Sequence, residues 1–590
     1  MTQPFDLIIR GGKIVDGTGK EAFDGDVGIV GDCIVEVGRI DAAAKQEIDA
    51  RGMIVTPGFV DVHTHYDGQV TWEHTLKPST DHGVTTVVIG NCGVGFAPCR
   101  AEERHVLVRV MEGVEDIPEI VMTTGIPWTW ETFPEFLDFI ESRAYDVDIA
   151  ALVPHAALRV YVMGERAEAS QVPTQADLDE MTRLVAEAIR AGAVGVATSH
   201  TLAHRDAHGN PAPHVKSGID ELLALAKGLR EAGGGIFQIA AGLFDKQVKF
   251  DRANAGEPGA LSFVEYEVNL LRAVAETSGG PVTFSLLDVP EAPGTNMEAL
   301  KRVRALNESG LTVKAQTFPR PVGLLVGLEM SQHPFSLHPS YWAIRELTFT
   351  ERVAKMRDPE FQRRLLSEKP GAALADAMTV LFVSRTLNAY RLGTPPRYDL
   401  SDEFSLLHEA KRRNVSPYVV ALEWLLENDG HHIMMSPAVN FSGTDLSGVA
   451  EMIAHEDVLI GLGDGGAHYG VLCDASYPTT LLTYWVRDRE QGRIPVSTAV
   501  NMLTYRNAQL FGFDDRGLIA PGKKADINVI DIDRLQLHGP EVQYDLPGGG
   551  RRVRQRAEGY VATILNGIIT RRDDRDLGVL PGKLLRSLPV

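Results

Sequence analysis

Cysteine is scarce in this sequence, and the features of secreted or membrane-spanning proteins are missing. The chain has 590 residues but four cysteines, Cys33, Cys92, Cys99 and Cys473. They are too few and too scattered for a disulfide framework. No apolar run reaches the length of a membrane-spanning helix, and the first residues lack the basic and apolar segments of a secretory signal. We therefore expect a reduced, cytoplasmic setting.

Positive charge is also in short supply. Lys and Arg total 58 against 79 for Asp and Glu, which gives a formal net charge of −21. The dense basic stretch RRVRQR at 551–556 is the exception. This balance argues against nucleic acid and anionic membranes as partners. The overall composition, 44% hydrophobic and 23% charged, is typical of a globular enzyme.

From residue 57 onward, apolar strand-like runs alternate with helical patterns. Such alternation is the signature of parallel β/α units, and eight units predict a closed (β/α)8 barrel of the TIM type. The runs lie at 59–65, 85–93, 148–157, 193–200, 235–242, 281–288, 311–318 and 457–466. Clear helical patterns lie between several of them, for example at 174–192 and 218–234. The sequence therefore predicts an α/β protein.

Three segments fall outside this alternation. Residues 1–56 and the end of the chain contain short strands punctuated by Gly, Asp and Pro, and we predict that both ends build one small β-sandwich. A long excursion at about 322–455 separates the seventh and eighth strand runs. The predicted domains are residues 1–56, the barrel at 57–490 with this insert, and 491–590. An insert of this size at the carboxyl face of a barrel would overhang the active site.

His63 and His65 end the first strand run, in the stretch GFVDVHTHYDG. Residues i and i+2 of a strand point to the same side, so both imidazoles face one point just past the strand end. Asp464 follows the eighth run in GLGDGG, and Cys92 follows the second run in GNCG. Imidazole, carboxylate and thiolate are zinc ligands, and parallel strands of a barrel end at one rim. The alternative for each is structural: a core histidine, a turn aspartate or a small buried thiol.

Longer motifs make the sequence resemble a known family. They are GFVDVHTHYDG, GNCGVGFAP, PHAALRVYVMG, GAVGVATS, RNAQLFGFDDRGLIAPGKKADINVID and LNGIITRR. Together they look like the amidohydrolase superfamily, and specifically like a divergent member of the N-acyl-D-amino-acid deacylase (D-aminoacylase) family. The resemblance runs across nearly the whole chain outside the 322–455 excursion. It implies zinc-dependent hydrolysis of an amide bond.

Carried over to this sequence, the resemblance assigns roles to four residues. His63 and His65 match the metal-binding histidine pair of the family, and Cys92 matches its metal-binding cysteine. Asp464 matches the aspartate that binds metal, acts as general base toward water and returns the proton to the leaving amine. The resemblance thus implies a zinc-activated water, since zinc lowers the pKa of bound water to roughly 7.

The match fails on two strands. The family places further histidine ligands at the ends of strands five and six, the second followed by a substrate-binding lysine. Here Gln238 or Ala240 stands in the first position and Leu286 in the second. Leu287 and Asp288 occupy the neighbourhood of the lysine. Three or four ligands from the other strands can hold one ion and leave a position open for water, so we predict one Zn²⁺ per chain.

Other polar residues of the predicted rim are candidates for binding substrate. They are His155, Arg159, Gln316, Arg320 and His468. The first two resemble a histidine–arginine motif of the family on strand three. Arg320 suits a substrate carboxylate because a guanidinium binds both oxygens, and an ion pair with a nearby acid is the alternative. Four histidines in the loop after strand four are either solvated or a source of a replacement ligand. They are His200, His204, His208 and His214.

The sequence therefore predicts a metal-dependent amidohydrolase that cleaves a linear amide, an N-acyl amino acid whose D-configuration is implied only by the resemblance. Two alternatives stay open. A cyclic-amide hydrolase of the hydantoinase type resembles the chain at both ends, but usually has a lysine on strand four, which AVGVATSH lacks. The other alternative is a non-catalytic, amidohydrolase-like binding protein, because two histidines are missing. The oligomeric state stays open, although large barrels often form homo-oligomers.

Overall fold

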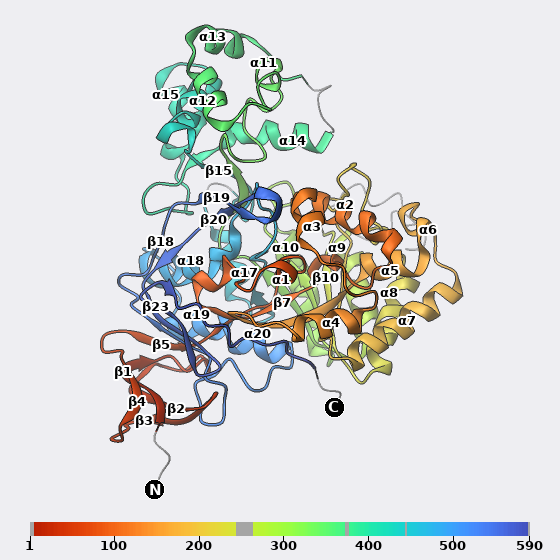
Figure 1. Ribbon diagram of the computed structural model, residues 1–590, viewed down its shortest axis with the longest axis vertical. Helices are drawn as coiled ribbons and strands as arrows, with labels where there is room; N and C mark the ends of the chain where they lie inside the picture. The colour runs from red at the N-terminus through yellow and green to blue at the C-terminus, as the bar shows by residue number, and fades with distance from the viewer. Residues whose placement is uncertain (1–4, 244–262, 372–376, 443–444, 588–590) are drawn as a thin grey trace.

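The computed structural model describes residues 5–243, 263–371, 377–442 and 445–587. A small lobe lies at the top of the molecule in Figure 1, a broad body lies below it, and a region of strands lies at the lower left. Within the described residues, no helix is both long and apolar enough to cross a membrane.

An eight-stranded parallel sheet forms the centre of the body. Its strands are β6 (Phe59–Asp61), β7 (Val84–Ile89), β8 (Asp148–Pro154), β9 (Gly195–Ser199), β10 (Ile236–Ala240), β11 (Val282–Ser285), β12 (Val313–Thr317) and β16 (Val458–Ile460). Neighbours in the sheet follow the order of the chain, and every pair is parallel. Each strand overlaps one predicted run, so the predicted α/β class is confirmed. β7 and β8 are buried along their whole length, as strands covered on both faces require.

The first and last strands of this sheet meet. Just beyond them, Thr64 and Gly465 form a parallel bridge, and the backbone N–H of His65 donates to the carbonyl of Gly465 over 2.7 Å. The Asn507 amide donates to the carbonyls of Val60 and Ile460, at 2.8 and 3.0 Å, and so joins β6 to β16. The sheet is therefore curled, consistent with a TIM-type barrel, and its seam lies beside two of the predicted metal ligands.

Helices alternate with these strands along the chain. In the first half of the chain they are α1 (Gln69–Trp72), α2 (Arg104–Glu115), α3 (Glu119–Gly125), α4 (Phe133–Glu141), α5 (His155–Met163), α6 (Glu165–Glu168), α7 (Gln175–Arg190), α8 (Ile219–Glu231), α9 (Phe263–Ser278) and α10 (Thr295–Glu308). α7 and α8 fall within the helical patterns at 174–192 and 218–234. α7 begins at a capping box in which Thr174 and Asp177 satisfy each other's backbone N–H groups.

Both ends of the chain contribute strands to a second sheet, at the lower left of Figure 1. Its order is β24-β23-β22-β17-β5-β1-β2-β3, with β4 beside β1. The strands are β1 (Phe5–Ile14), β2 (Phe23–Val30), β3 (Cys33–Gly38), β4 (Ala44–Asp49), β5 (Ile54–Pro57), β17 (Ile527–Ile530), β22 (Tyr560–Leu565), β23 (Ile568–Arg572) and β24 (Arg575–Asp576). β17 pairs antiparallel with β5, which joins the two ends. The sandwich arrangement and the domain limits stay predictions.

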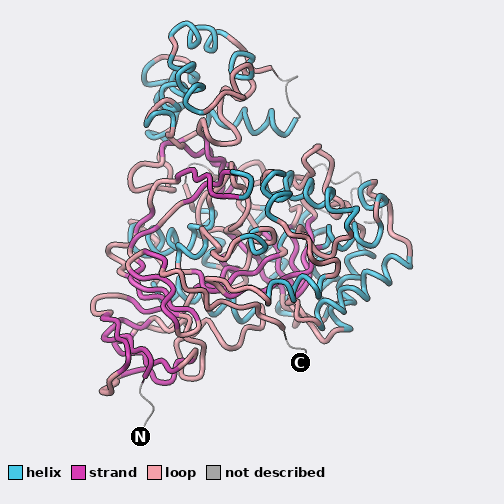
Figure 2. The backbone as a smooth tube through the Cα atoms, viewed as in Figure 1, coloured by secondary structure: helices cyan, strands magenta, loops and turns pink. Residues whose placement is uncertain are grey.

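The excursion between β12 and β16 forms most of the upper lobe in Figure 1, and Figure 2 shows that this lobe is mainly helical. A three-stranded antiparallel sheet lies at its base, with β13 (Val322–Val326), β14 (Tyr390–Arg391) and β15 (Met434–Val439). The helices of the lobe are α11 (Pro339–Trp342), α12 (Phe349–Arg357), α13 (Pro359–Ser367), α14 (Ala377–Arg385), α15 (Leu406–Arg413) and α16 (Pro417–Leu425), whereas α17 (Ser447–Ala454) lies in the body, beside β16. Because side chains such as Phe335, Phe361 and Leu425 form a separate apolar core, the lobe packs largely on itself.

The base of this lobe touches the loop that follows β16. The backbone N–H of Leu325 donates to Val471 over 2.7 Å, and that of Ser331 donates to Gly470 over 2.9 Å. The insert therefore makes direct backbone contacts with the loop after β16, in which Asp464 lies. After this loop come α18 (Tyr477–Thr480), a π-helical segment η10 (Leu481–Asp488), α19 (Val496–Leu503) and α20 (Tyr505–Leu510).

Candidate metal centre

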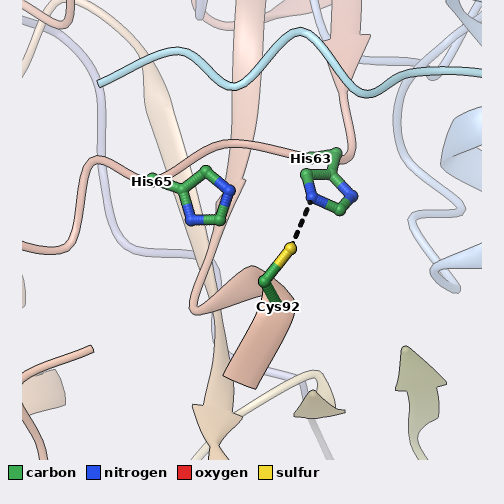
Figure 3. Close-up of side chains that lie close together, drawn as sticks. All are labelled: His63, His65 and Cys92. Atoms are coloured by element: carbon green, nitrogen blue, oxygen red, sulfur yellow. Dashed lines mark hydrogen bonds between the residues drawn. The ribbon is translucent and has the colours of Figure 1, made fainter. Parts of the chain in front are cut away.

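His63, His65 and Cys92 converge at the carboxyl end of the parallel sheet. The two histidines follow β6, and Cys92 lies in a short 3₁₀ turn, η2 (Asn91–Gly93), directly after β7. One ligand atom from each of the three lies within 4.8 Å of the others, and all three residues are buried. His63 Nε2 is 3.3 Å from the Cys92 sulfur. Figure 3 shows the sulfur pointing between the two rings.

Asp464 joins the three from the other side of the seam. Its Oδ1 lies 3.5 Å from Nε2 of His63 and 3.5 Å from Nε2 of His65. Its side chain is 23% exposed, whereas each histidine is 1% exposed. The four residues predicted as metal ligands are thus brought together, and the carboxylate is the most accessible of them.

The opposite nitrogens of the two imidazoles face other protein groups. Nδ1 of His63 lies 2.7 Å from Oε1 of Gln316, at hydrogen-bond distance. Nδ1 of His65 lies 3.4 Å from Oε1 of Glu115, at the end of α2. Since an amide or carboxylate oxygen can only accept, each Nδ1 would carry the proton and each Nε2 would offer its lone pair to the centre. Gln316, predicted to bind substrate, therefore lies behind His63 and accepts its N–H.

The backbone of Cys92 is held in an uncommon conformation. Its φ is +54°, in the left-handed region that few residues other than glycine adopt. Its N–H donates to Oε1 of Gln238 over 3.0 Å, and its carbonyl accepts from Nε2 of His214 over 2.9 Å. Asp464 and His468 also have positive φ, at +45° and +54°. Backbone of this kind costs about 1–3 kcal/mol per residue and is concentrated at functional sites.

The two positions where family ligands are missing are filled by other groups. Gln238 is fully buried and accepts the Cys92 N–H, so it positions the thiol from the strand where the first histidine is expected. Leu286 is also fully buried and apolar. These residues provide no imidazole on strands five and six, in agreement with the sequence.

Burial and mutual charge set the protonation of the centre. Burial lowers the pKa of His63 to about 4 and raises that of the Cys92 thiol to about 12. Burial also acts to lower the pKa of His65, but the carboxylates of Glu115 and Asp464 outweigh it and raise that pKa well above its usual value. For Asp464, burial acts upward, but the two histidines outweigh it and hold its pKa below the ordinary range.

These side chains fit a divalent metal ion. Two imidazoles, one thiol and one carboxylate form a donor set that zinc binds. A thiol buried this deeply ionises only beside a strong positive charge, which a divalent ion at this point would supply. The hydrogen bond between Nδ1 of His63 and Gln316 fits this pattern, since metal-binding imidazoles donate their second N–H to an oxygen.

His155 and Arg159, predicted to bind substrate, form a buried cluster with Glu221 of α8. Nε2 of His155 lies 2.9 Å from Oε1 of Glu221, and its Nδ1 lies 2.8 Å from the hydroxyl of Thr198. The Arg159 guanidinium pairs with the other Glu221 oxygen. Burial acts to raise the pKa of Glu221, but His155 and Arg159 outweigh it and lower that pKa to about 2. Both ring nitrogens of His155 therefore have protein partners, and its role in binding substrate stays a prediction.

Arg320 is buried and also paired. Its guanidinium donates to Oδ1 of Asp474 over 2.8 Å and to the carbonyl of Cys473 over 2.7 Å. The ring of Tyr398, from the excursion between β12 and β16, lies 3.7 Å from its central carbon. This is the ion pair that the sequence offered as the alternative to a substrate anchor. Arg320 thus contacts both the excursion between β12 and β16 and the segment after β16.

The remaining histidines divide into buried and accessible groups. His468 is 22% exposed and lies 4.0 Å from Oδ2 of Asp464, and its role in binding substrate stays a prediction. In the loop after β9, His200 and His214 are fully buried, which corrects the view that this loop is a solvated cluster. Nε2 of His214 donates to the carbonyl of Cys92. His208 is exposed.

Sequence reasoning missed Glu115. It is buried, and its carboxylate lies between His65 and His468, at 3.4 and 3.5 Å from their ring nitrogens. The available signal was its position as the last residue of an amphipathic helix. Acidic residues are disfavoured there because the carboxyl end of a helix is already partly negative.

Comparison with known proteins agrees with this fold. The family described as "Amidohydrolase family" matches residues 46–571. D-aminoacylase of Alcaligenes xylosoxydans xylosoxydans is 31% identical over 234 residues, which are 40% of this chain and 44% of that protein. The chain thus matches less than half of the length of that relative.

Two solved structures share the fold over 99% of this chain and 100% of theirs. One is D-aminoacylase, described for the functional role of its binuclear metal centre, with one-metal activation and second-metal attenuation; it has a TM-score of 0.64 and 22% identity. The other is N-acyl-D-glutamate deacylase from Bordetella bronchiseptica, complexed with zinc and a phosphonate inhibitor, with a TM-score of 0.60 and 22% identity.

The curled parallel sheet thus carries histidine, cysteine and aspartate side chains at its carboxyl end, a donor set suited to a metal ion. This chain belongs to the amidohydrolase family, and the proteins that it is similar to include D-aminoacylases. The resemblance seen in the sequence motifs is confirmed.

Proposed function

We propose that this protein is a metal-dependent amidohydrolase that cleaves a linear amide, an N-acyl amino acid, with N-acyl-D-amino acids as the first class to test. The convergence of His63, His65 and Cys92 within 4.8 Å, with Asp464 beside them, is the observation that carries the proposal. The names of the matched deacylases support the substrate class.

One zinc ion per chain is the cofactor that we propose. His63, His65, Cys92 and Asp464 would hold it, and when bound it would polarise the amide carbonyl and make a water molecule acidic enough to attack at neutral pH. Gln238 and Leu286 support a single ion, because neither offers an imidazole from strands five and six. One-metal activation, described for D-aminoacylase, is in keeping with such a site.

Asp464 is the residue that we assign to proton transfer. Like an ordinary aspartate, it is ionised at neutral pH, so its carboxylate can accept a proton from the attacking water. Its partial exposure places it toward the side from which a substrate arrives. The same carboxyl then returns the proton to the nitrogen of the leaving amine, which departs uncharged. His468, 4.0 Å away and on the same accessible side, is placed to bind the substrate carbonyl oxygen.

Hydrolysis assays with purified, zinc-supplemented protein test this function. N-acetyl and longer N-acyl derivatives of D- and L-amino acids are incubated with it, and the released primary amine is measured. We expect release from at least one N-acyl amino acid, with the D-series faster, and loss of release after chelation. Opening of hydantoins without amine release from linear amides would favour the cyclic-amide alternative. No turnover of either class would favour a binding protein.

A further inference from the structure

A buried carboxylate connects the metal-facing and the substrate-facing histidines. Glu115 is the last residue of α2 and is 1% exposed. Its Oε1 lies 3.4 Å from Nδ1 of His65, and its Oε2 lies 3.5 Å from Nε2 of His468. One carboxyl group therefore reaches two imidazoles that belong to different strands and have different exposure.

The backbone around Glu115 fixes this position. The next residue, Asp116, caps the end of α2, and its φ of +52° turns the chain away from the helix axis. The N–H of His468 donates to the carbonyl of Glu115, and the N–H of Gly470 donates to Oδ2 of Asp116 over 2.9 Å. The end of α2 and the loop of Asp464 and His468 are thus joined by three contacts: two from the backbone and one through the Glu115 side chain.

The charge of Glu115 needs an explanation. Among the residues that the structure describes, its ion-pair partners are these two histidines, and no arginine or lysine pairs with it. A buried carboxylate is costly unless N–H donors surround it. His63 is held by the neutral amide of Gln316 instead, so the carboxylate behind His65 is a specific difference between the two imidazoles.

We propose that Glu115 is a positioning residue that acts through both histidines. It holds His65 with Nδ1 protonated, so that Nε2 faces the metal, and its negative charge strengthens that imidazole as a ligand. It also holds the ring of His468 beside Asp464. The inference rests on the proposed function, because it assigns a role within the same metal centre.

The test is the zinc affinity of a Glu115→Gln variant, measured by competition with a chromophoric chelator. Glutamine keeps the shape of the side chain but removes its charge. We expect zinc binding to weaken by about 10–100-fold, the effect typical of losing an oxygen partner behind a metal ligand. Glu112→Gln is the matched control: it makes the same change one turn earlier on α2, where the side chain accepts the backbone N–H of Glu119. Its zinc affinity should stay within about twofold of wild type.

Two further variants keep the test decisive. Glu115→Asp retains the charge but shortens the side chain by one methylene, so it should also weaken zinc binding. It replaces Glu115→Gln as the test if that variant does not fold. His468→Asn should leave zinc affinity within about twofold and lower kcat. Because Glu115 acts through His468 in turnover, the double variant Glu115→Gln/His468→Asn should lose less kcat than the product of the two single losses.

The outcomes separate this inference from the proposed function. Weaker zinc binding in the Glu115 variants, with the Glu112 control unchanged, supports the inference. Wild-type zinc affinity in folded Glu115→Gln or Glu115→Asp protein overturns it, while amide hydrolysis by the wild type leaves the proposed function intact. A wild-type protein that binds no zinc overturns both.

Discussion

Replacing Asp464 by asparagine is expected to lower kcat on the N-acyl amino acid substrate by about 10²–10⁴-fold, the usual contribution of a positioned acid–base group. Asparagine has nearly the same shape, but its amide cannot accept the proton from the attacking water. The three other ligands stay in place, so metal content should fall much less than kcat. Steady-state kinetics and metal analysis of the same preparation measure both quantities.

The matched control for this prediction is Asp457→Asn. Asp457 lies just before the same strand, β16, at the opposite end of the sheet, where its carboxylate pairs with Lys314 over 2.6 Å. This variant should lose stability but keep its kcat. The assignment of Asp464 is contradicted if Asp464→Asn retains metal and turns over substrate within about threefold of wild type.

Replacing Arg516 by methionine should destabilise the folded protein by about 3–5 kcal/mol, the cost of breaking a buried ion pair. The Arg516 guanidinium is 2% exposed and donates to Asp148 over 2.8 Å and to Thr86 over 2.8 Å. It also lies 3.5 Å from Asp526. Methionine would leave two buried carboxylates without a cation. Equilibrium unfolding in urea measures the difference.

The stability lost in Arg516→Met should depend on pH. Burial raises the pKa of Asp526 to about 7, even though Arg516 acts to lower it. Without the arginine this pKa rises further, so the folded state holds a proton that the unfolded state has released above about pH 4. A folded state that binds more protons than the unfolded state loses stability as pH rises. The free energy of unfolding of the variant should therefore be lower at pH 8 than at pH 6.

Arg183→Met is the comparison for Arg516→Met. Arg183 pairs with Glu180 and Glu187 on the surface of α7 and is 57% exposed. Exposed pairs of this kind contribute about 0–1 kcal/mol, so this variant should unfold nearly as wild type does. Equal losses in the two variants would contradict the account of a buried network at Asp148.

Much of the fold could be predicted because it rests on local patterns. Buried parallel strands require apolar runs, and eight such runs gave the eight strands in order. The metal centre could be predicted for a similar reason. His63, His65, Cys92 and Asp464 each lie within four residues of the carboxyl end of a strand, and parallel strands bring those ends to one rim.

The partners of these residues could not be predicted, because they depend on contacts between distant segments. Gln316 was expected to bind substrate, yet its oxygen accepts from His63, 253 residues away in the sequence. Arg320 finds Asp474 in a loop that follows another strand. Neither pairing has a periodic signal in the chain. The same holds for the hydrogen bond from His214 to the Cys92 carbonyl.

The central claim is that four side chains at the rim hold one metal ion, and metal stoichiometry tests it most directly. Protein purified without chelators and supplied with zinc is analysed by plasma mass spectrometry beside Cys92→Ser and Cys99→Ser. Cys99 is also buried but hydrogen-bonds to the carbonyl of Arg100, so its variant is the control. The account predicts one zinc per chain in wild type and Cys99→Ser, and a sharp loss in Cys92→Ser. Two ions per chain would contradict the single-ion centre, and no bound metal in the zinc-supplied wild type would contradict the metal centre itself.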